Sequence, residues 1–164
     1  MRIFRTATVI ILVLWCVLIF ALSSENAALS SETSGKFTEA VIDVIYSDFE
    51  DMDVAKQEVI THNVTFVIRK LAHFTIFALL GVFALASIVS YSKPSFALKS
   101  LFSAAFCLLY AISDEIHQLF VAGRSGEIRD VIIDFLGSLL GIIFISLIFK
   151  KNRFFNAFVG GTNA

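Results

Sequence analysis

The sequence is poor in charge, proline and cysteine. Of its 164 residues only 16% are charged, one is proline and two are cysteine, whereas a soluble domain usually carries about 25% charged residues. Two cysteines imply no disulfide framework, and a net charge of −1 argues against a nucleic-acid partner. Hydrophobic residues instead make up 57% of the chain, more than so small a soluble body can bury. We therefore predict a small multi-pass membrane protein whose partner is the lipid bilayer.

Uncharged stretches between charged residues mark the expected membrane spans. They contain 19 residues after Arg5, 22 after Lys70, 14 after Lys99 and 15 after Asp134. A helix needs about 20 residues to cross the hydrocarbon layer, so the last two spans must take ionisable residues into the membrane. The sequence predicts an all-α fold, a single domain over 1–164 built as a bundle of four transmembrane helices. The expected helices are 4–24, 68–91, 97–120 and 130–149.

The distribution of charge predicts the orientation of these helices. Seven of the 13 basic residues share one side of the membrane with none of the 14 acidic residues; they are Arg2, Arg5, Lys93, Lys99, Lys150, Lys151 and Arg153. Basic residues accumulate in short cytoplasmic loops. We therefore expect a protein of the cell membrane with both termini cytoplasmic and a long extracytoplasmic loop, 25–67, between the first two helices.

The composition of the chain around this loop differs between two segments. Residues 23–35 are rich in serine and read as an extended linker. In 37–49 apolar residues recur at helical spacing among acids, which is typical of a short amphipathic helix at a membrane surface. A lid that packs over the helix bundle fits the same pattern.

The short spans bring ionisable side chains into the membrane. The third helix ends in Asp114, Glu115, His117 and Gln118, and the fourth begins with Asp130 and Asp134. Arg69 and His73 occupy the same end of the second helix. Such groups are costly in hydrocarbon and normally face the bundle interior or a water-filled cavity. We expect them to converge in the outer leaflet, with Arg124 held over the cavity by the turn between the last two helices.

These residues resemble the VanZ-like family of small bacterial membrane proteins. The resemblance rests on several motifs: Trp15, Ile19-Phe20 and Ser23-Ser24 in the first helix, Arg69–Phe74, Asp114–Phe120, Gly123-Arg124, and Asp130–Asp134 with Gly137 and Gly141. The namesake of the family is linked to resistance to the lipoglycopeptide teicoplanin. The resemblance implies a role in the bacterial envelope and in susceptibility to such drugs.

One hypothesis for the polar groups is hydrolysis or group transfer on an anionic envelope lipid or peptide. Glu115 or His117 would act as general acid or base, Asp114 would orient the imidazole of His117, and His73 would join them. Arg69 and Arg124 would grip the anionic group, assisted by Gln118, Asp130 and Asp134. A metal site is an alternative, because His73, His117 and the nearby carboxylates are suitable ligands. The spacing matches neither His-x-x-x-His nor Cys-x-x-Cys and basic neighbours oppose a cation, so we expect no cofactor and no metal.

Two other interpretations stay open at this point. The same groups could form a buried network that only fixes helix packing, although buried ion pairs are weak stabilisers. They could also capture an anionic lipid or drug, or relay protons during transport, without breaking a bond. A four-helix transporter would need to be a dimer.

Overall fold

The computed structural model describes residues 2–91 and 95–151, and these form helices and no strand. Four helices are long and apolar enough to cross a membrane, as the sequence predicted. Three of the four expected helices agree with the structure to within two residues at each end. The elements are α1 (Arg2–Ser23), α2 (Ala27–Ile45), the 3₁₀ turn η1 (Phe49–Asp51), α3 (Val54–Tyr91), α4 (Phe96–Gln118) and α5 (Ile128–Lys151).

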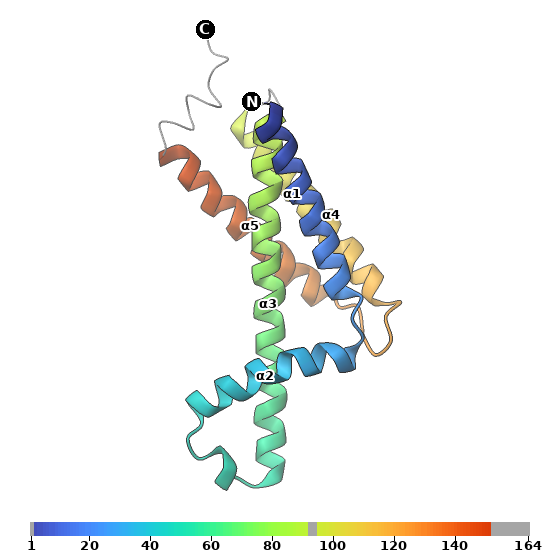
Figure 1. Cartoon of the computed structure of the whole chain (residues 1–164), viewed down its shortest axis with the longest axis vertical. Helices are drawn as coiled ribbons and strands as arrows, with labels where there is room; N and C mark the ends of the chain where they lie inside the picture. Colours follow the sequence, from blue (N-terminus) through green and yellow to red (C-terminus); the bar gives the residue numbers. More distant parts are fainter. Residues whose placement is uncertain (1, 92–94, 152–164) are drawn as a thin grey trace.

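The long helix α3 runs through the middle of the molecule. Figure 1 shows α1 and α4 beside it and α5 crossing it at an angle, and α3 packs against each of these three helices. α1 begins and α5 ends at the same end of the bundle (Figure 1). The opposite end, where α1 and α4 finish and α5 starts, is called the site end below.

Hydrogen bonds between helices supplement the apolar packing of the bundle. The indole Nε1 of Trp15 donates to the carbonyl oxygen of Ile76 at 3.0 Å, joining α1 to α3. The Tyr110 hydroxyl donates to the carbonyl oxygen of Cys16 at 2.6 Å, joining α4 to α1. In an apolar environment such bonds help to fix how helices pack. Buried apolar side chains surround them, including Ile19, Phe77, Leu80, Ala84, Cys107 and Ala111.

Glycine allows α5 to cross α3 in direct backbone contact. A Cβ atom added to Gly141 would lie 1.9 Å from the carbonyl oxygen of Ala78, and one added to Gly137 would lie 2.3 Å from that of Phe74. No side chain larger than hydrogen fits such a gap without moving one helix. The Gly-x-x-x-Gly spacing in the sequence thus marks the α3–α5 crossing, as such spacing does between many membrane helices.

The prediction that the second spanning helix starts at residue 68 was wrong. α3 begins at Val54, where Asp53 caps it by accepting a hydrogen bond from the Lys56 backbone N–H at 3.1 Å. Its 38 residues correspond to a length of about 57 Å, well beyond a hydrocarbon layer of about 30 Å. The charged residues therefore limit the apolar part of this helix but do not end the helix itself.

The extended linker predicted at 23–35 was also wrong, because α2 begins at Ala27. The hydroxyl groups that suggested a linker bond within the helix instead, as when Ser34 Oγ donates to the Ser30 carbonyl oxygen at 2.8 Å. α2 crosses α3 (Figure 1), and the hydroxyls of Thr38 and Thr65 meet there at 3.0 Å. Residues 27–67 form an arm that extends past the site end.

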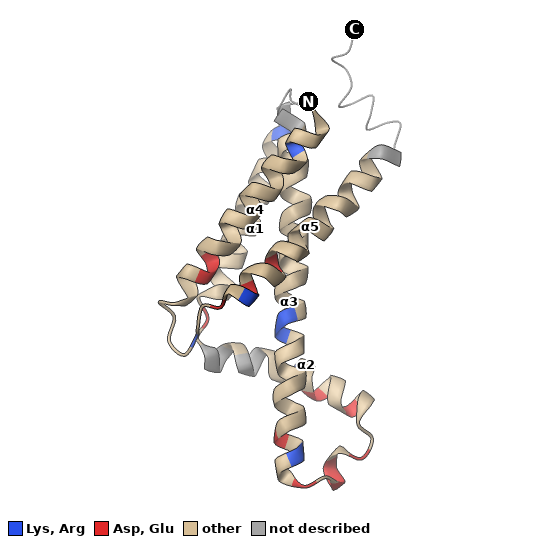
Figure 2. Ribbon diagram, turned by 180° about the vertical axis from the view of Figure 1, so that it is seen from behind, with Lys and Arg blue, Asp and Glu red and all other residues tan. Residues whose placement is uncertain are grey.

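Acidic residues gather on this arm and at the site end (Figure 2). That agrees with the charge separation seen in the sequence. Lys93 and Arg153, which entered the orientation argument, lie outside the described residues. The side of the membrane that each end faces stays a prediction.

Candidate functional site

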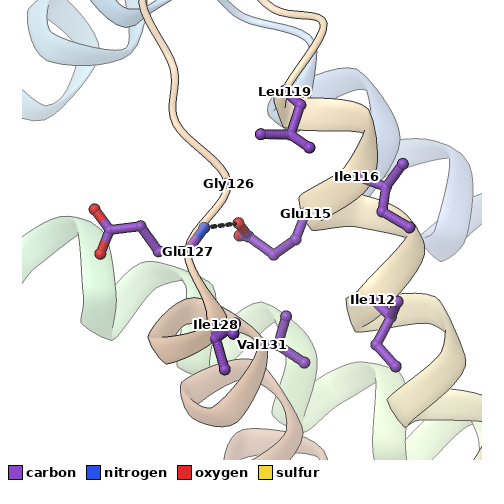
Figure 3. Close-up of a pocket in the computed structure, with 8 residues that line it drawn as sticks. All are labelled: Ile112, Glu115, Ile116, Leu119, Gly126, Glu127, Ile128 and Val131. Atoms are coloured by element: carbon purple, nitrogen blue, oxygen red, sulfur yellow. Dashed lines mark hydrogen bonds between the residues drawn. The ribbon is translucent and has the colours of Figure 1, made fainter.

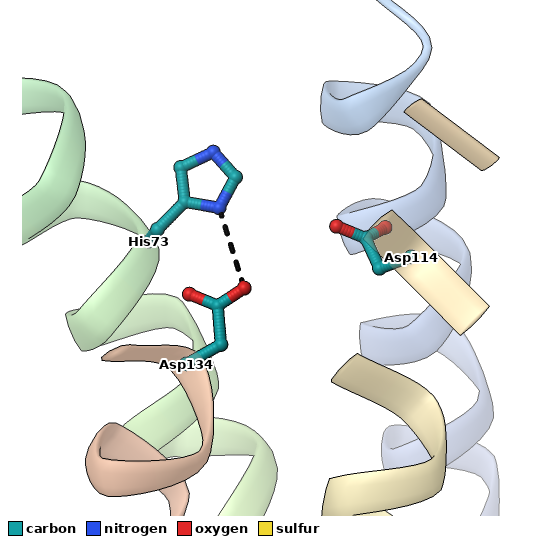
Figure 4. A group of neighbouring side chains, drawn as sticks. All are labelled: His73, Asp114 and Asp134. Atoms are coloured by element: carbon teal, nitrogen blue, oxygen red, sulfur yellow. Dashed lines mark ion pairs between the residues drawn. The ribbon is translucent and has the colours of Figure 1, made fainter. Parts of the chain in front are cut away.

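A buried cluster at the site end joins three of the spanning helices. It consists of His73 on α3, Asp114 on α4 and Asp134 on α5, and one nitrogen or oxygen from each lies within 4.8 Å of the others. His73 Nδ1 and Asp134 Oδ2 lie 3.7 Å apart. Figure 4 shows the two side chains of α3 and α5 facing each other, with Asp114 across from them. We call these three residues the His–Asp–Asp cluster.

The two carboxylates of the cluster differ in how they are satisfied. Asp134 is fully buried, and neither of its carboxylate oxygens has a hydrogen-bond partner. Asp114 is also buried, but its Oδ2 accepts hydrogen bonds from Ser23 Oγ at 2.8 Å and from Gln118 Nε2 at 3.0 Å. Burying a carboxylate that accepts no hydrogen bond is costly in free energy. Within the cluster, this cost applies to Asp134.

Glu115 fixes the turn between α4 and α5. Its Oε2 accepts a hydrogen bond from the backbone N–H of Glu127 at 2.8 Å (Figure 3), and its Oε1 accepts one from Gln118 Nε2 at 3.3 Å. This carboxylate is buried and holds the turn against the end of α4. Glu115 therefore shapes the entrance to the site.

A polar cavity of about 180 Å³ opens above the cluster, between α3, the α4–α5 turn and α5. Gln118 lines it and also bonds to Asp114, so one side chain links the cavity to the His–Asp–Asp cluster. The lining residues are Phe66, Arg69, Lys70, Gln118, Gly123, Arg124, Ser125, Glu127 and Asp130.

Two guanidinium groups in this cavity lack a carboxylate partner. Lys70 pairs with Asp130, and Glu127 pairs with Arg129 at 2.6 Å. The ion pairs among the described residues include neither Arg69 nor Arg124.

Arg124 is held in place by neutral acceptors. Its Nε donates to the Glu25 carbonyl oxygen at 2.9 Å and its Nη1 to Gln118 Oε1 at 3.4 Å. Burial and the nearby positive charge of Arg69 lower the pKa of Arg124, although a guanidinium stays protonated in proteins. An anion in the cavity would relieve the repulsion between the two groups.

An apolar groove of about 380 Å³ lies beside the polar cavity, between the end of α4 and the start of α5. Ile112, Ile116, Leu119 and Val131 line it together with Glu115 (Figure 3). Glu127 lines both the groove and the cavity. The site end therefore has a charged compartment next to an apolar one.

His117 lies apart from the cluster. It contacts α1 and Ser24, the residue that follows α1. Its Nε2 is 3.0 Å from Ser24 Oγ, and its ring stacks on Phe20 with 4.2 Å between the centroids. In the described part of the chain Asp114 bonds to Ser23 and Gln118 and does not hold this imidazole. The roles proposed for these residues stay predictions, but the geometry favours His73 as the imidazole of the site.

The structure thus places the nine predicted site residues in three settings. His73, Asp114 and Asp134 form the cluster; Arg69, Gln118, Arg124 and Asp130 line the polar cavity; Glu115 and His117 brace the turn and α1.

Two kinds of residue have roles that the sequence did not predict. Lys70 was taken only as a boundary marker, although it neutralises Asp130. Ser23 and Ser24 entered only through the family resemblance, yet they bond to Asp114 and His117. The sequence contains one signal for this contact. Two adjacent serines end the first apolar span, and the third span ends in acidic residues.

Comparisons with known proteins point to one family. The family model described as VanZ/LLP1 matches residues 8–150, which is most of the chain. Neither the curated proteins nor the solved structures compared with the chain include a match.

Proposed function

Because the chain belongs to the VanZ/LLP1 family, and has four helices suited to a membrane, we propose that it acts on an envelope lipid or peptide with an anionic group. The polar cavity binds the anionic group, and the buried side chains below the cavity promote hydrolysis or group transfer on it. The protein works in the outer leaflet of the bacterial cell membrane. The acidic ends of α4 and α5 reach this leaflet.

The observation that carries this proposal is the pair of guanidinium groups in the polar cavity. Arg69 and Arg124 line it, and neither forms an ion pair with a carboxylate of the described residues. Planar guanidinium groups bind phosphate or carboxylate through parallel hydrogen bonds. The cavity is accordingly suited to an anion that comes from outside the chain.

The apolar groove indicates a lipid rather than a soluble anion. It adjoins the polar cavity at Glu127, so a head group in the cavity leaves an attached acyl chain beside Ile116 and Leu119. Burying apolar surface contributes roughly 25 cal/mol per Å². The lipid is thus held by charge at one end and by apolar contact at the other.

The side chains proposed for the chemistry lie at the same end of the bundle as the polar cavity. Gln118 lines the cavity and contacts both Asp114 and Arg124. Glu115 and His73 add a second carboxylate and an imidazole near the same end of the bundle. General acid and base groups of these types promote hydrolysis and group transfer.

Lipid retention tests the binding step. The full chain, purified in mild detergent, is compared by native mass spectrometry with Arg124→Ala and Arg69→Ala. We expect each substitution to reduce the copurified anionic lipid by about tenfold or more, since a charge-assisted hydrogen bond contributes about 1.5–3 kcal/mol.

Arg129→Ala is the matched control. Arg129 is an exposed arginine at the same end, paired with Glu127, and it lines neither the cavity nor the groove. Equal lipid loss from all three variants would mean that net charge alone attracts lipid, and would contradict a defined binding cavity.

The chemical step needs a separate measurement. Envelope lipids and peptidoglycan fragments from cells that express the wild type, Glu115→Gln or His73→Ala are compared by mass spectrometry. We expect a product that is present with the wild type and absent with the variants. Identical profiles combined with retained lipid would favour the second interpretation, a binder or proton-coupled transporter that breaks no bond.

Family membership suggests the cellular readout. The VanZ-like resemblance implies a role in susceptibility to teicoplanin-type lipoglycopeptides. We expect expression of the wild type, but not of Arg124→Ala at equal membrane abundance, to change the minimum inhibitory concentration of teicoplanin. No change with the wild type would separate this chain from the role linked to the family's namesake.

A further inference from the structure

The His–Asp–Asp cluster contains more negative charge than its neighbours neutralise. Asp114 and Asp134 are 3% and 0% exposed, and the ion pairs among the described residues connect neither of them to a lysine or an arginine. The donors to Asp114 are the neutral groups of Ser23 and Gln118. A buried carboxylate without a cation costs several kcal/mol. Among the described residues, the ionic partner of these two acids is the imidazole of His73, which balances one negative charge at most.

The geometry of the cluster suits a metal ion. Ligand atoms about 2 Å from a tetrahedral ion lie about 3.3 Å from one another. His73 Nδ1 and Asp134 Oδ2 are already 3.7 Å apart, and Asp114 brings an oxygen to within 4.8 Å. Small side-chain rotations would close the remaining distance. Neither oxygen of Asp134 accepts a hydrogen bond in the described part of the chain, and its ion pair with His73 (Figure 4) requires a protonated imidazole.

We infer that His73, Asp114 and Asp134 bind a divalent transition-metal ion, with Zn²⁺ as the best match to one imidazole and two carboxylates. Two carboxylates and one divalent cation together are neutral, which removes the cost of burying the acids. Ser23 and Gln118 hold Asp114 through Oδ2, in the way that hydrogen bonds orient ligands around metal ions. Three protein ligands leave a coordination position open.

Such a site could not be identified from spacing along the chain. The three ligands are separated by 41 and 20 positions, and each comes from a different helix. The basic neighbours that argued against a cation, Arg69 and Arg124, line the polar cavity and form no ion pair with the cluster. Gln118 lies between these compartments, since it contacts both Arg124 and Asp114.

This inference rests on the proposed function and adds a metal ion to the proposed reactive site. Its test measures metal binding and needs no activity assay. The full untagged chain in detergent is stripped with chelator, incubated with one equivalent of Zn²⁺, desalted and analysed for metal. We expect about one zinc per chain in the wild type and at least a tenfold weaker affinity in Asp134→Asn and His73→Ala. Asp43→Asn, a matched substitution at an exposed position of α2, should bind zinc like the wild type.

The unfolding temperature of the metal-free protein distinguishes an acid that binds metal from an acid that stabilises the fold. Asp134→Asn replaces an unpartnered buried carboxylate by a neutral group of the same shape, so the metal-free variant should unfold at a higher temperature than the metal-free wild type. Added Zn²⁺ should raise the midpoint of the wild type and leave that of the variant unchanged. X-ray absorption of the loaded protein should show nitrogen and oxygen ligands with imidazole scattering and no sulfur.

Three results would overturn the inference. These are a folded wild type that retains no zinc, an Asp134→Asn variant that binds it as tightly, or sulfur ligation through Cys16 or Cys107. Lipid retention by the same samples separates this failure from that of the proposed function. A wild type that retains lipid but no zinc contradicts only the metal site, whereas one that retains zinc but no lipid contradicts only the anion cavity.

Discussion

At the residue scale, the site end is shaped by how each buried charge is compensated. Lys70 pairs with Asp130, Glu115 accepts a backbone N–H, and Asp114 accepts two neutral donors. Among the described residues, the fully buried side-chain oxygens without a hydrogen bond are those of Asp134. Compensated groups fix the framework, whereas the uncompensated ones, Asp134 and the two guanidinium groups, are available to ligands.

The Lys70–Asp130 pair allows a test of the framework. Its side chains are 25% and 17% exposed, so removing one partner leaves a largely buried charge unpaired. We expect Lys70→Met and Asp130→Asn each to lower the free energy of unfolding by about 1–3 kcal/mol, and the double variant to lose less than the sum. Thermal or denaturant unfolding in detergent measures this coupling.

Lys56→Met is the matched control for that cycle. Lys56 pairs with Asp53 on the arm, but its side chain is 73% exposed, and exposed pairs contribute little. Additive effects of Lys70→Met and Asp130→Asn would show that the two side chains do not interact as the structure describes.

At the element scale, the α3–α5 crossing positions the cluster. His73 and Asp134 lie one turn or less from Phe74 and Gly137, where the two backbones touch. The pair can approach because no side chain separates the helices at that point. The site therefore depends on glycine in α5 as much as on its own polar groups.

A Gly141→Ala substitution tests this dependence. The new methyl group would meet the Ala78 carbonyl oxygen at 1.9 Å, so α5 must move away from α3. We expect an apparent loss of about 1–3 kcal/mol in unfolding free energy, typical of overpacking. Weaker zinc binding should accompany it, because the shift separates His73 from Asp134.

Gly35→Ala provides the opposite expectation within the same chain. Gly35 is inside α2, and an added Cβ has no neighbour within 4 Å. Alanine there should be neutral or stabilise the helix by about 0.5–1 kcal/mol. Equal destabilisation by the two substitutions would contradict the close crossing of α3 and α5.

At the scale of the whole molecule, the arm and the charge separation define two different ends. The arm extends past the site end, and acidic side chains concentrate there (Figure 2). A transmembrane protein keeps its basic loops in the cytoplasm. The arm, the polar cavity and the cluster should then face the outside of the cell together.

Cysteine accessibility in intact cells tests this orientation. Ser47→Cys lies on the arm and Ser95→Cys lies just before α4, at the opposite end, and both positions are exposed. With Cys16 and Cys107 replaced by alanine, a membrane-impermeant thiol reagent should label position 47 directly and position 95 only after permeabilisation. The reverse pattern would place the cavity in the cytoplasm and contradict an outer-leaflet substrate.

The order of apolar and charged residues is sufficient to predict which segments can span a membrane and which polar residues lie within those segments. Charge-free length sets the limits of a span, because hydrocarbon tolerates few unpaired charges. The same criterion failed at 54–67, where α3 continues although the composition becomes polar. Outside the membrane a helix needs only a cap and a packing partner, and here these are Asp53 and α2.

Which polar groups contact one another depends on how the helices pack. Sequence spacing places Asp114 and His117 near each other on one helix, but the two side chains have different partners. His117 contacts Ser24, just after α1, whereas Asp114 accepts a hydrogen bond from Ser23 and lies beside His73 and Asp134. The choice depends on the angle at which α5 crosses α3, and that angle is set by backbone contact at Gly137 and Gly141. Contacts between separate helices arise from packing in three dimensions, which periodicity along one helix does not encode.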